Sequence, residues 1–136
     1  MTGAGAPGGP GIIKALQIDK RLNLIVADAD ELATGRFLNK SFYKIPKANS
    51  PEFIDEILNI CSKEDIHVIF PLVTLELFKF SKYKDIFDKR GIKIIVSDNE
   101  GLEIANDKSA LYRHLAAKNI TTPLFRVVDT VKEFSF

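Results

Sequence analysis

The sequence has a single cysteine, almost no net charge and no long apolar run, and each shortage excludes a class of protein. Cys61 alone cannot form an intrachain disulfide or a cysteine-rich metal site. The 19 Lys and Arg residues against 18 Asp and Glu leave a formal charge of +1, which predicts no binding of nucleic acid or of an anionic membrane. No run approaches the ~18 apolar residues of a membrane span, and the N-terminal residues lack a signal-peptide pattern. We therefore expect a soluble, cytoplasmic domain.

The chain does contain enough apolar residues for one packed core. Of its 136 residues 46% are hydrophobic and 27% are charged, which is typical of a single globular domain. Glycine is unevenly distributed, because five of the eight glycines lie in the first eleven residues.

Short β-branched runs alternate with helical patterns along the rest of the chain. We expect strands at 24–27, 42–45, 67–70, 92–96 and 124–128. We expect helices at 12–19, 51–61, 74–89, 98–105 and 107–118, with a loop and a helical turn at 31–41. Ser50 and Asn106 are expected to cap two of these helices, and Gly91 to end another in the left-handed conformation.

This alternation predicts an α/β, Rossmann-like fold, in which a parallel sheet lies between helices on both faces, in three layers. The first strand would be short or missing, because only Met1 and Thr2 precede the glycine cluster. Ligands of such folds bind at the carboxyl ends of the strands.

The segment from Gly3 to Gly8 satisfies the pattern G-x-G-x-x-G, and Asp28 follows Gly8 by twenty residues. In a dinucleotide enzyme the glycines would admit the pyrophosphate and the acidic residue would bind the ribose. Pro7 removes one backbone N–H from the loop, and Gly9-Pro10-Gly11 lengthens it. Two interpretations therefore stay open, an NAD(P) site and a tight strand-to-helix turn that binds nothing.

Several further motifs, taken in their order, resemble the N-terminal domain of ATP-grasp ligases, and most of all the carbamoyl-phosphate-synthase-like group. Besides the glycine cluster, these motifs are residues 26–30, 70–73 with 75–77, and 95–98. Asn106-Asp107-Lys108, followed by Leu111, Leu115 and residues 119–123, looks like the entry to the ATP-grasp domain itself. The resemblance implies a pre-ATP-grasp Rossmann-like domain over 1–105 and the truncated start of an ATP-grasp domain over 106–136.

The resemblance also implies a chemistry. Such ligases use ATP and Mg²⁺ to activate a carboxylate as an acyl phosphate, which an amine or another nucleophile then attacks. Their phosphate-covering loop, adenine-binding lysine and Mg²⁺ ligands do not fit into the residues after Thr122, so this chain alone would be catalytically inactive and would bind no cofactor tightly. Its partners would be a small carboxylate substrate and the missing ATP-grasp domain, and a homodimer also stays open.

Residue by residue, the resemblance places Lys108 near the ATP phosphates and Glu76 beside the substrate cleft. Asp28 and Asp30 would bind polar groups of the substrate. The ligand-facing turn would consist of Gly3, Gly5, Gly8 and Gly9. Each of these residues also has a purely structural explanation: Lys108 as a solvated lysine, Glu76 as a carboxylate stabilised by the helix dipole, the aspartates as strand ends.

Other residues offer less. His67 and His114 lie 47 residues apart without a carboxylate pattern, so we expect no metal site. Two alternatives to the ligase fragment remain, an NAD(P)-binding domain of an oxidoreductase and a ligand-free interaction module. We expect the aromatic stretch from Phe78 to Phe87 to belong to the core, with a docking face for a partner domain as the alternative.

Overall fold

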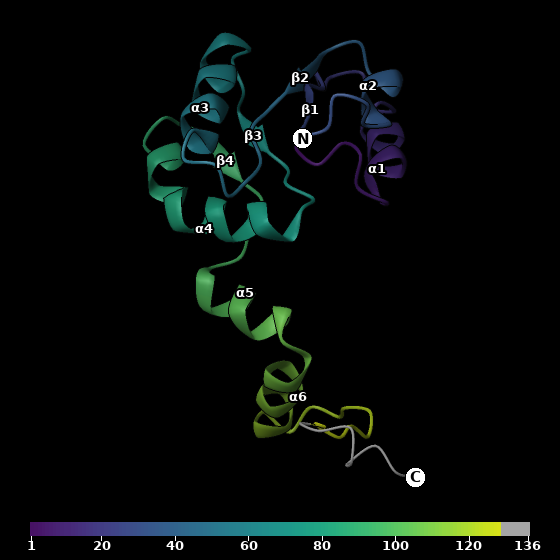
Figure 1. Ribbon diagram of the computed structural model, residues 1–136, viewed down its shortest axis with the longest axis vertical. Coiled ribbons are helices and arrows are strands. Elements are labelled where there is room, and N and C mark those ends of the chain that lie inside the picture. The colour runs from purple at the N-terminus through teal and green to yellow at the C-terminus, as the bar shows by residue number, and fades with distance from the viewer. Residues whose placement is uncertain (129–136) are drawn as a thin grey trace. The chain divides into compact units, whose positions relative to one another are not determined.

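A computed structural model describes residues 1–128 of the chain (Figure 1). The chain divides into two compact units, Met1–Asp98 and a second that begins at Asn99, and each is described by itself. The first unit contains, in order, α1 (Gly9–Leu16), β1 (Val26–Asp28), α2 (Gly35–Leu38), β2 (Phe42–Lys44), α3 (Phe53–Lys63), β3 (Val68–Ile69), α4 (Thr74–Asp88) and β4 (Lys93–Ile94). The second contains α5 (Asn99–Asn106) and α6 (Lys108–Ala117).

The strands are short and parallel, and Thr2 joins them. β1 pairs with β2, and β3 pairs with β4. Thr2 forms parallel bridges both to Ala27 in β1 and to Pro71 directly after β3. The order across the unit is therefore β2, β1, Thr2, β3, β4, which is the strand order of a doubly wound sheet. The parallel strands that the sequence predicts are confirmed. The first strand, expected to be short or missing, is represented among the described residues by the bridges of Thr2 alone.

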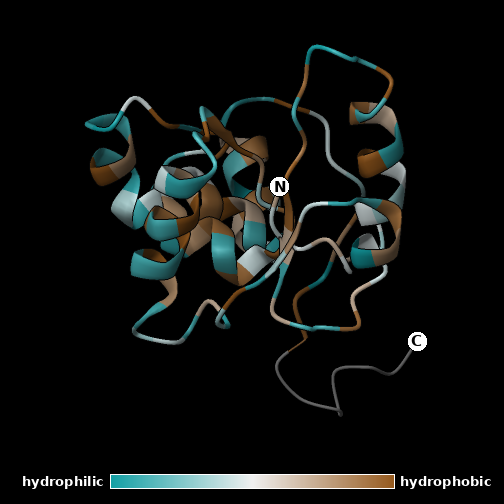
Figure 2. Ribbon diagram, turned by 90° about the horizontal axis from the view of Figure 1, so that it is seen from above, coloured by the Kyte–Doolittle hydropathy of each residue, from teal (hydrophilic) through white to brown (hydrophobic). Residues whose placement is uncertain are grey.

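Apolar side chains form two clusters in the first unit. The larger one centres on Phe53 of α3 with Phe80 and Phe87 of α4, all fully buried. Their rings pack edge to face, with centroids 5.4 and 5.8 Å apart. The smaller cluster joins α1 to β1 through Ala4, Ile13 and Val26. Figure 2 shows helices that alternate between hydrophobic and hydrophilic residues, as the three- and four-residue spacings in the sequence predict.

The helix starts differ from the predicted ones for local reasons. α1 begins at Gly9 instead of Ile12, because Pro10 fits the first helical turn. α3 begins at Phe53, and the Ser50 hydroxyl hydrogen-bonds the Glu52 carboxylate instead of capping the helix. Gly91 has φ +74°, so its predicted left-handed conformation is confirmed.

In the second unit, Asp107 rather than Asn106 caps α6. Its carboxylate accepts hydrogen bonds from the backbone N–H groups of Ser109 and Ala110, at 2.7 and 3.1 Å. The predicted strand at 124–128 is wrong, since these residues have no regular structure. Phe125 instead packs its ring 4.9 Å from that of Tyr112.

The predicted domain boundary at residue 105 stays a prediction, and residues 129–136 of the expected ATP-grasp start lie outside the described residues. Within the part of the chain that is described, no helix has the length and apolar character needed to cross a membrane.

Candidate functional site

The strand order locates one place where a ligand crevice can form. The chain that leaves Thr2 runs through α1 to β1 on one side, whereas β3, on the other side of Thr2, continues into α4. Two neighbouring connections that depart in opposite directions leave a crevice at the carboxyl ends of the strands. The candidate site therefore consists of the loop from Gly3 to Gly9, the carboxyl end of β1 and the segment 71–76.

The glycines of the loop are explained by different local contacts. Gly3 has φ +70°, and a Cβ there would lie 2.8 Å from Val73 Cγ2. A Cβ on Gly9 would lie 2.6 Å from the Ala4 carbonyl oxygen, and one on Gly5 would lie 3.0 Å from Ala33 Cβ. The packing of the chain itself therefore requires a small residue at these three positions.

Gly8 is the exception. It is exposed, and the nearest atom to a Cβ there would be Ile12 Cδ1 at 3.9 Å. It precedes α1 as the N-cap residue, without a side-chain cap and without an acidic residue in the first turn. Backbone N–H groups at such a helix start favour an anionic ligand, although Pro10 contributes none and the Gly9 N–H already donates to the Ala6 carbonyl at 2.7 Å. At Gly8 the absence of a side chain thus leaves the backbone open from outside the chain.

The two aspartates at the carboxyl end of β1 accept hydrogen bonds from backbone N–H groups. Asp28 Oδ2 accepts a hydrogen bond from the Gly5 N–H at 2.7 Å, and its Oδ1 accepts one from the Asp30 N–H at 2.8 Å. Asp30 Oδ1 in turn accepts from the Leu32 N–H at 2.9 Å. Asp28 therefore fixes the glycine loop to the end of β1, and its orientation for a ligand is set by the same bonds.

Glu76 lies in the first turn of α4 and is only 4% exposed. Its Oε2 accepts a hydrogen bond of 2.6 Å from the Thr2 hydroxyl, which is equally buried. Burial raises the pKa of the Glu76 carboxyl above its ordinary value, and the charge of Asp28 acts in the same direction. The Thr2 hydrogen bond and the Met1 amino group oppose that shift.

The site residues predicted from the sequence thus divide between the two units. The structure brings Gly3, Gly5, Gly8, Gly9, Asp28 and Glu76 together around the end of the central strand position, with Asp30 next to Asp28. Lys108 lies in the second unit, exposed in the first turn of α6. Thr2 was missed, although a polar residue in the place of a central strand is unusual enough to draw attention.

The described residues also limit the chemistry available here. Residues 1–128 contain no group of three or more His, Cys, Asp and Glu residues that could hold a metal ion. Burial raises the pKa of the Cys61 thiol to about 11, which leaves it protonated and a poor nucleophile. The site can therefore bind and orient a polar or anionic ligand through backbone groups and carboxylates.

Comparisons with known proteins agree with this architecture. Residues 11–95 match the family described as "PylC-like, N-terminal domain". The structure is similar to that of a complete multifunctional pyruvate carboxylase from Rhizobium etli, with a TM-score of 0.53 and 18% sequence identity. That similarity covers 86% of this chain and 12% of the carboxylase chain. No protein of curated function matches the sequence. The family match spans more than half of the chain, which therefore belongs to the PylC-like N-terminal domains, the pre-ATP-grasp domains of ATP-grasp enzymes.

Proposed function

We propose that this chain is the N-terminal, substrate-side part of an ATP-dependent ligase that joins a carboxylate to an amine or another nucleophile through an acyl phosphate. The single observation that supports the proposal most is the convergence of the glycine loop, Asp28 and Glu76 at the switch point of a doubly wound sheet. In this proposal the sheet has helices on both faces and forms a three-layer fold. The parent enzyme belongs to the carbamoyl-phosphate-synthase-like group and is cytoplasmic.

The residues have distinct roles in the proposal. The exposed backbone at Gly8 receives the anionic end of a small carboxylate substrate, next to Gly5, whose own N–H is held by Asp28. Gly3 and Gly9 give the loop its shape, and Asp28 orients it through the Gly5 N–H. Asp30 is exposed and contacts polar groups of the substrate, whereas Glu76 keeps α4 in register with the loop through Thr2.

ATP and Mg²⁺ belong to the complete enzyme. Because residues 1–128 offer no carboxylate cluster for a metal, no step of the reaction is assigned to Mg²⁺ on these residues. Lys108, an exposed ammonium group in α6, would approach the ATP phosphates, where a flexible point charge offsets phosphate charge. The phosphoryl transfer itself requires the ATP-grasp domain.

Amide chemical shifts test the loop directly. We expect acetate, succinate and inorganic phosphate to shift the amide signals of Gly5, Gly8 and Gly9 in a saturable way. Gly8→Ala should weaken that binding at least fivefold, or about 1 kcal/mol, because its methyl group occupies the open approach. Gly11→Ala is the matched control, since a Cβ on Gly11 meets no atom within 4 Å and lies beyond the loop. Equal binding by both variants would contradict the proposal that the loop binds the ligand.

Two further measurements test the reaction class. With ATP and Mg²⁺ present, phosphate release by the 136-residue chain should stay at background. Release above background would contradict the proposal that this chain alone is catalytically incomplete. Reading the coding sequence beyond the codon for Phe136 should give an in-frame continuation with a glycine-rich loop and a Glu…Glu-x-Asn set.

The strand order also suits a dinucleotide-binding domain of an oxidoreductase, which remains the second candidate. Asp28 would then bind the ribose, but both of its carboxylate oxygens already accept backbone N–H groups. Titration with NADH followed by fluorescence separates the two. Saturable micromolar binding that weakens in Asp28→Ala, but not in Asp30→Ala, would favour the dinucleotide.

A further inference from the structure

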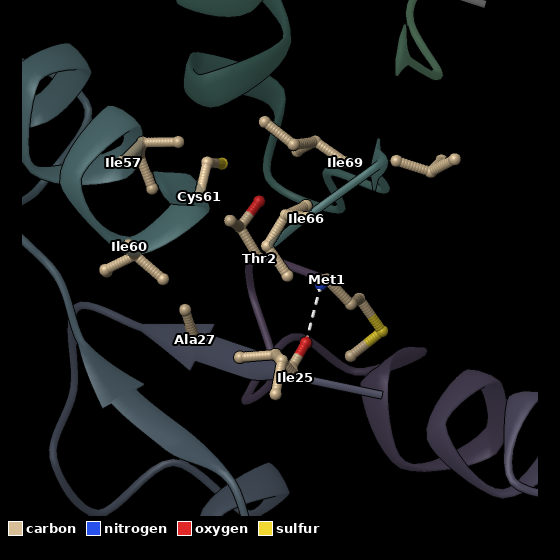
Figure 3. Close-up of a pocket in the computed structure, with 10 residues that line it drawn as sticks. Met1, Thr2, Ile25, Ala27, Ile57, Ile60, Cys61, Ile66 and Ile69 are labelled. Carbon is tan, nitrogen blue, oxygen red and sulfur yellow. Dashed lines mark hydrogen bonds between the residues drawn. The ribbon is translucent and has the colours of Figure 1, made fainter. Parts of the chain in front are cut away.

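Two hollows of the first unit have contrasting linings. The hollow around Thr2 is lined mainly by apolar side chains, among them Ile57, Ile60 and Ile69 (Figure 3). The other lies between α2 and β2 and measures about 660 Å³ with its open mouth included. Charged side chains surround one aromatic ring there: Glu31, Arg36, Lys40, Phe42 and Lys44. None of these five residues belongs to the candidate site above, so the function proposed for that site does not use them.

The fold brings these five side chains together around β2, the outermost strand of the order given above. Phe42 and Lys44 are two positions apart in β2, so both point to the same face of the sheet. Phe42 packs against the smaller apolar cluster, which places this face under α1. The helix that supplies Arg36 is fixed to the glycine loop at Gly35, where a Cβ would lie 2.4 Å from Ala4 Cβ. The hollow is therefore held between a strand and a helix that pack on the same core.

Arg36 is the oriented cation of the hollow. Its guanidinium lies 5.7 Å from the centre of the Phe42 ring, which is a cation–π contact. Its Nη1 donates to the Glu31 carbonyl oxygen at 3.0 Å and to Glu31 Oε1 at 3.1 Å. The Nε and Nη2 groups have no acceptor among residues 1–128. Arg36 thus keeps free the donors with which arginine binds an oxyanion.

The charges of the hollow do not balance. Glu31 supplies the only carboxylate of the lining, and its Oε2 lies 3.9 Å from Lys44 Nζ while its Oε1 accepts from Arg36. Lys40 forms no ion pair with any residue that the structure describes. Three cations against one carboxylate leave an excess of two positive charges in the hollow, whereas the whole chain has a formal charge of only +1. The excess is therefore local to this place.

Protection of an edge strand explains only part of this arrangement. A lysine on an outer strand such as β2 discourages pairing with another chain, and Lys44 can have that role. Arg36 and Lys40 lie outside the strand and do not contribute to it. Their gathering around one hollow, with a guanidinium held over a ring, indicates an anionic ligand instead.

We propose that the hollow between α2 and β2 is a binding site for a phosphate monoester. Such a group has close to two negative charges at neutral pH and three acceptor oxygens, which match the charge excess and the three cations. Arg36 donates to it through Nε and Nη2, and the two lysines act as point charges. Glu31 competes with the ligand for Arg36 and Lys44, so this carboxylate lowers the affinity of the site.

Titration of the full chain with methyl phosphate, followed by amide chemical shifts, tests the proposal. We expect saturable shifts at the amides of residues 36–44. Dimethyl phosphate, a diester of similar shape with one negative charge, should bind at least about threefold more weakly at equal ionic strength. This comparison separates a monoester from the diesters of lipids and nucleic acids.

Two variants of opposite sign test the residues. Lys40→Gln should weaken binding of methyl phosphate at least about threefold, and it removes no contact between described residues, so folding is preserved. Glu31→Gln should strengthen binding by a similar factor, because it removes the competing charge. Lys89→Gln is the matched control, since it removes the charge of an exposed lysine after α4, outside the hollow, and should leave the affinity unchanged.

Equal affinities of Lys40→Gln and Lys89→Gln would overturn the proposal, as would unchanged or weaker binding by Glu31→Gln. Equal binding of the two esters would also overturn it and assign the hollow to phosphodiesters. The Gly8 amide is followed in the same titrations as the reporter of the glycine loop. Shifts at Gly8 without shifts at residues 36–44 would contradict this proposal alone, whereas the reverse result would contradict only the ligand role of the loop.

Discussion

Glu76 is the residue on which two parts of the candidate site depend. Its carboxylate connects the first turn of α4 to Thr2, which in turn bridges β1 and the end of β3. A carboxylate that loses its hydration on burial needs such a hydrogen bond, since burial without a partner costs several kcal/mol. One hydroxyl opposes a large loss of solvation, so the charged form of Glu76 remains disfavoured and its pKa is raised.

Glu76→Gln should therefore change how the stability of the first unit depends on pH. A carboxyl whose folded pKa is raised above its unfolded value of 4.5 contributes stability below that value. This contribution is lost as the pH rises through the folded pKa. Glutamine does not titrate and can still accept from Thr2, so the urea midpoint of Glu76→Gln, relative to that of the unchanged chain, should rise from pH 4 to pH 8.

The matched control for this prediction is Glu100→Gln, an exposed carboxylate in the first turn of α5. Its urea midpoints should keep the pH dependence of the unchanged chain. If Glu76→Gln also keeps that dependence, the carboxyl of Glu76 is charged at neutral pH and its burial does not determine its protonation.

At this scale the sequence predicted which residues matter better than what they contact. Asp28 and Glu76 were both singled out by their places after strands. Their partners, the Gly5 N–H and the Thr2 hydroxyl, are 23 and 74 positions away in the sequence. Only the pairing of strands brings them together, and no local pattern contains that information.

Among the elements, the first turn of α1 contains two glycines in opposite surroundings. Gly9 and Gly11 both belong to α1, but Gly9 is buried against the Ala4 carbonyl oxygen whereas Gly11 is exposed. The loop and the helix are thereby held at the closest distance that their backbones allow. Substitution of each glycine by alanine should therefore have opposite effects on stability.

We expect Gly9→Ala to destabilise the first unit by about 1–3 kcal/mol, because its Cβ would lie 2.6 Å from Ala4 O and the backbone must shift. Gly11→Ala should instead stabilise it, by up to about 1 kcal/mol, since alanine is the better helix former and has free space. Thermal unfolding of both variants checks the signs. Equal effects would mean that the loop does not pack on α1 as described.

The capping of α6 gives a second test at the scale of elements. Asp107→Ala should speed amide exchange at Ser109 and Ala110 about fivefold, because each N–H loses its acceptor and a cap of this kind contributes ~1 kcal/mol. Asn106→Ala is the control and should leave both rates unchanged. The reverse result would restore the cap predicted from the sequence.

Sequence patterns predicted the helices because the spacing of apolar residues is local. They did not predict which residue caps α6. Asn106 and Asp107 are adjacent and both are good N-cap residues, so only the backbone conformation decides between them. The strand at 124–128 failed for a different reason. A β-branched run forms a strand only where a neighbour pairs with it, and none of the described residues does so.

At the scale of the whole molecule, the buried residues show which part of the chain forms the hydrophobic core. Every member of the two apolar clusters lies between Met1 and Asp98, whereas α5 and α6 contain no buried residue. The alternation of helices with parallel strands and the family could be predicted from the sequence, because both follow from the succession of motifs, whereas the strand order was not predicted. The division after Asp98 could not, since the helical pattern continues without a break in composition.

A chain shortened to residues 1–98 should therefore keep the cooperative unfolding of the full chain, with a melting temperature within about 4 °C, because it retains both clusters. A chain that ends at Asp88 is the control. It loses Ile92 and Ile94, both buried in the larger cluster, and with them β4, the partner of β3. Removing two buried isoleucines costs at least several kcal/mol, which is comparable to the total stability of a small domain. Calorimetry should then show no folded state for the shorter control. Loss of the transition already at residue 98 would mean that the second unit contributes to the core, and that the two units fold as one.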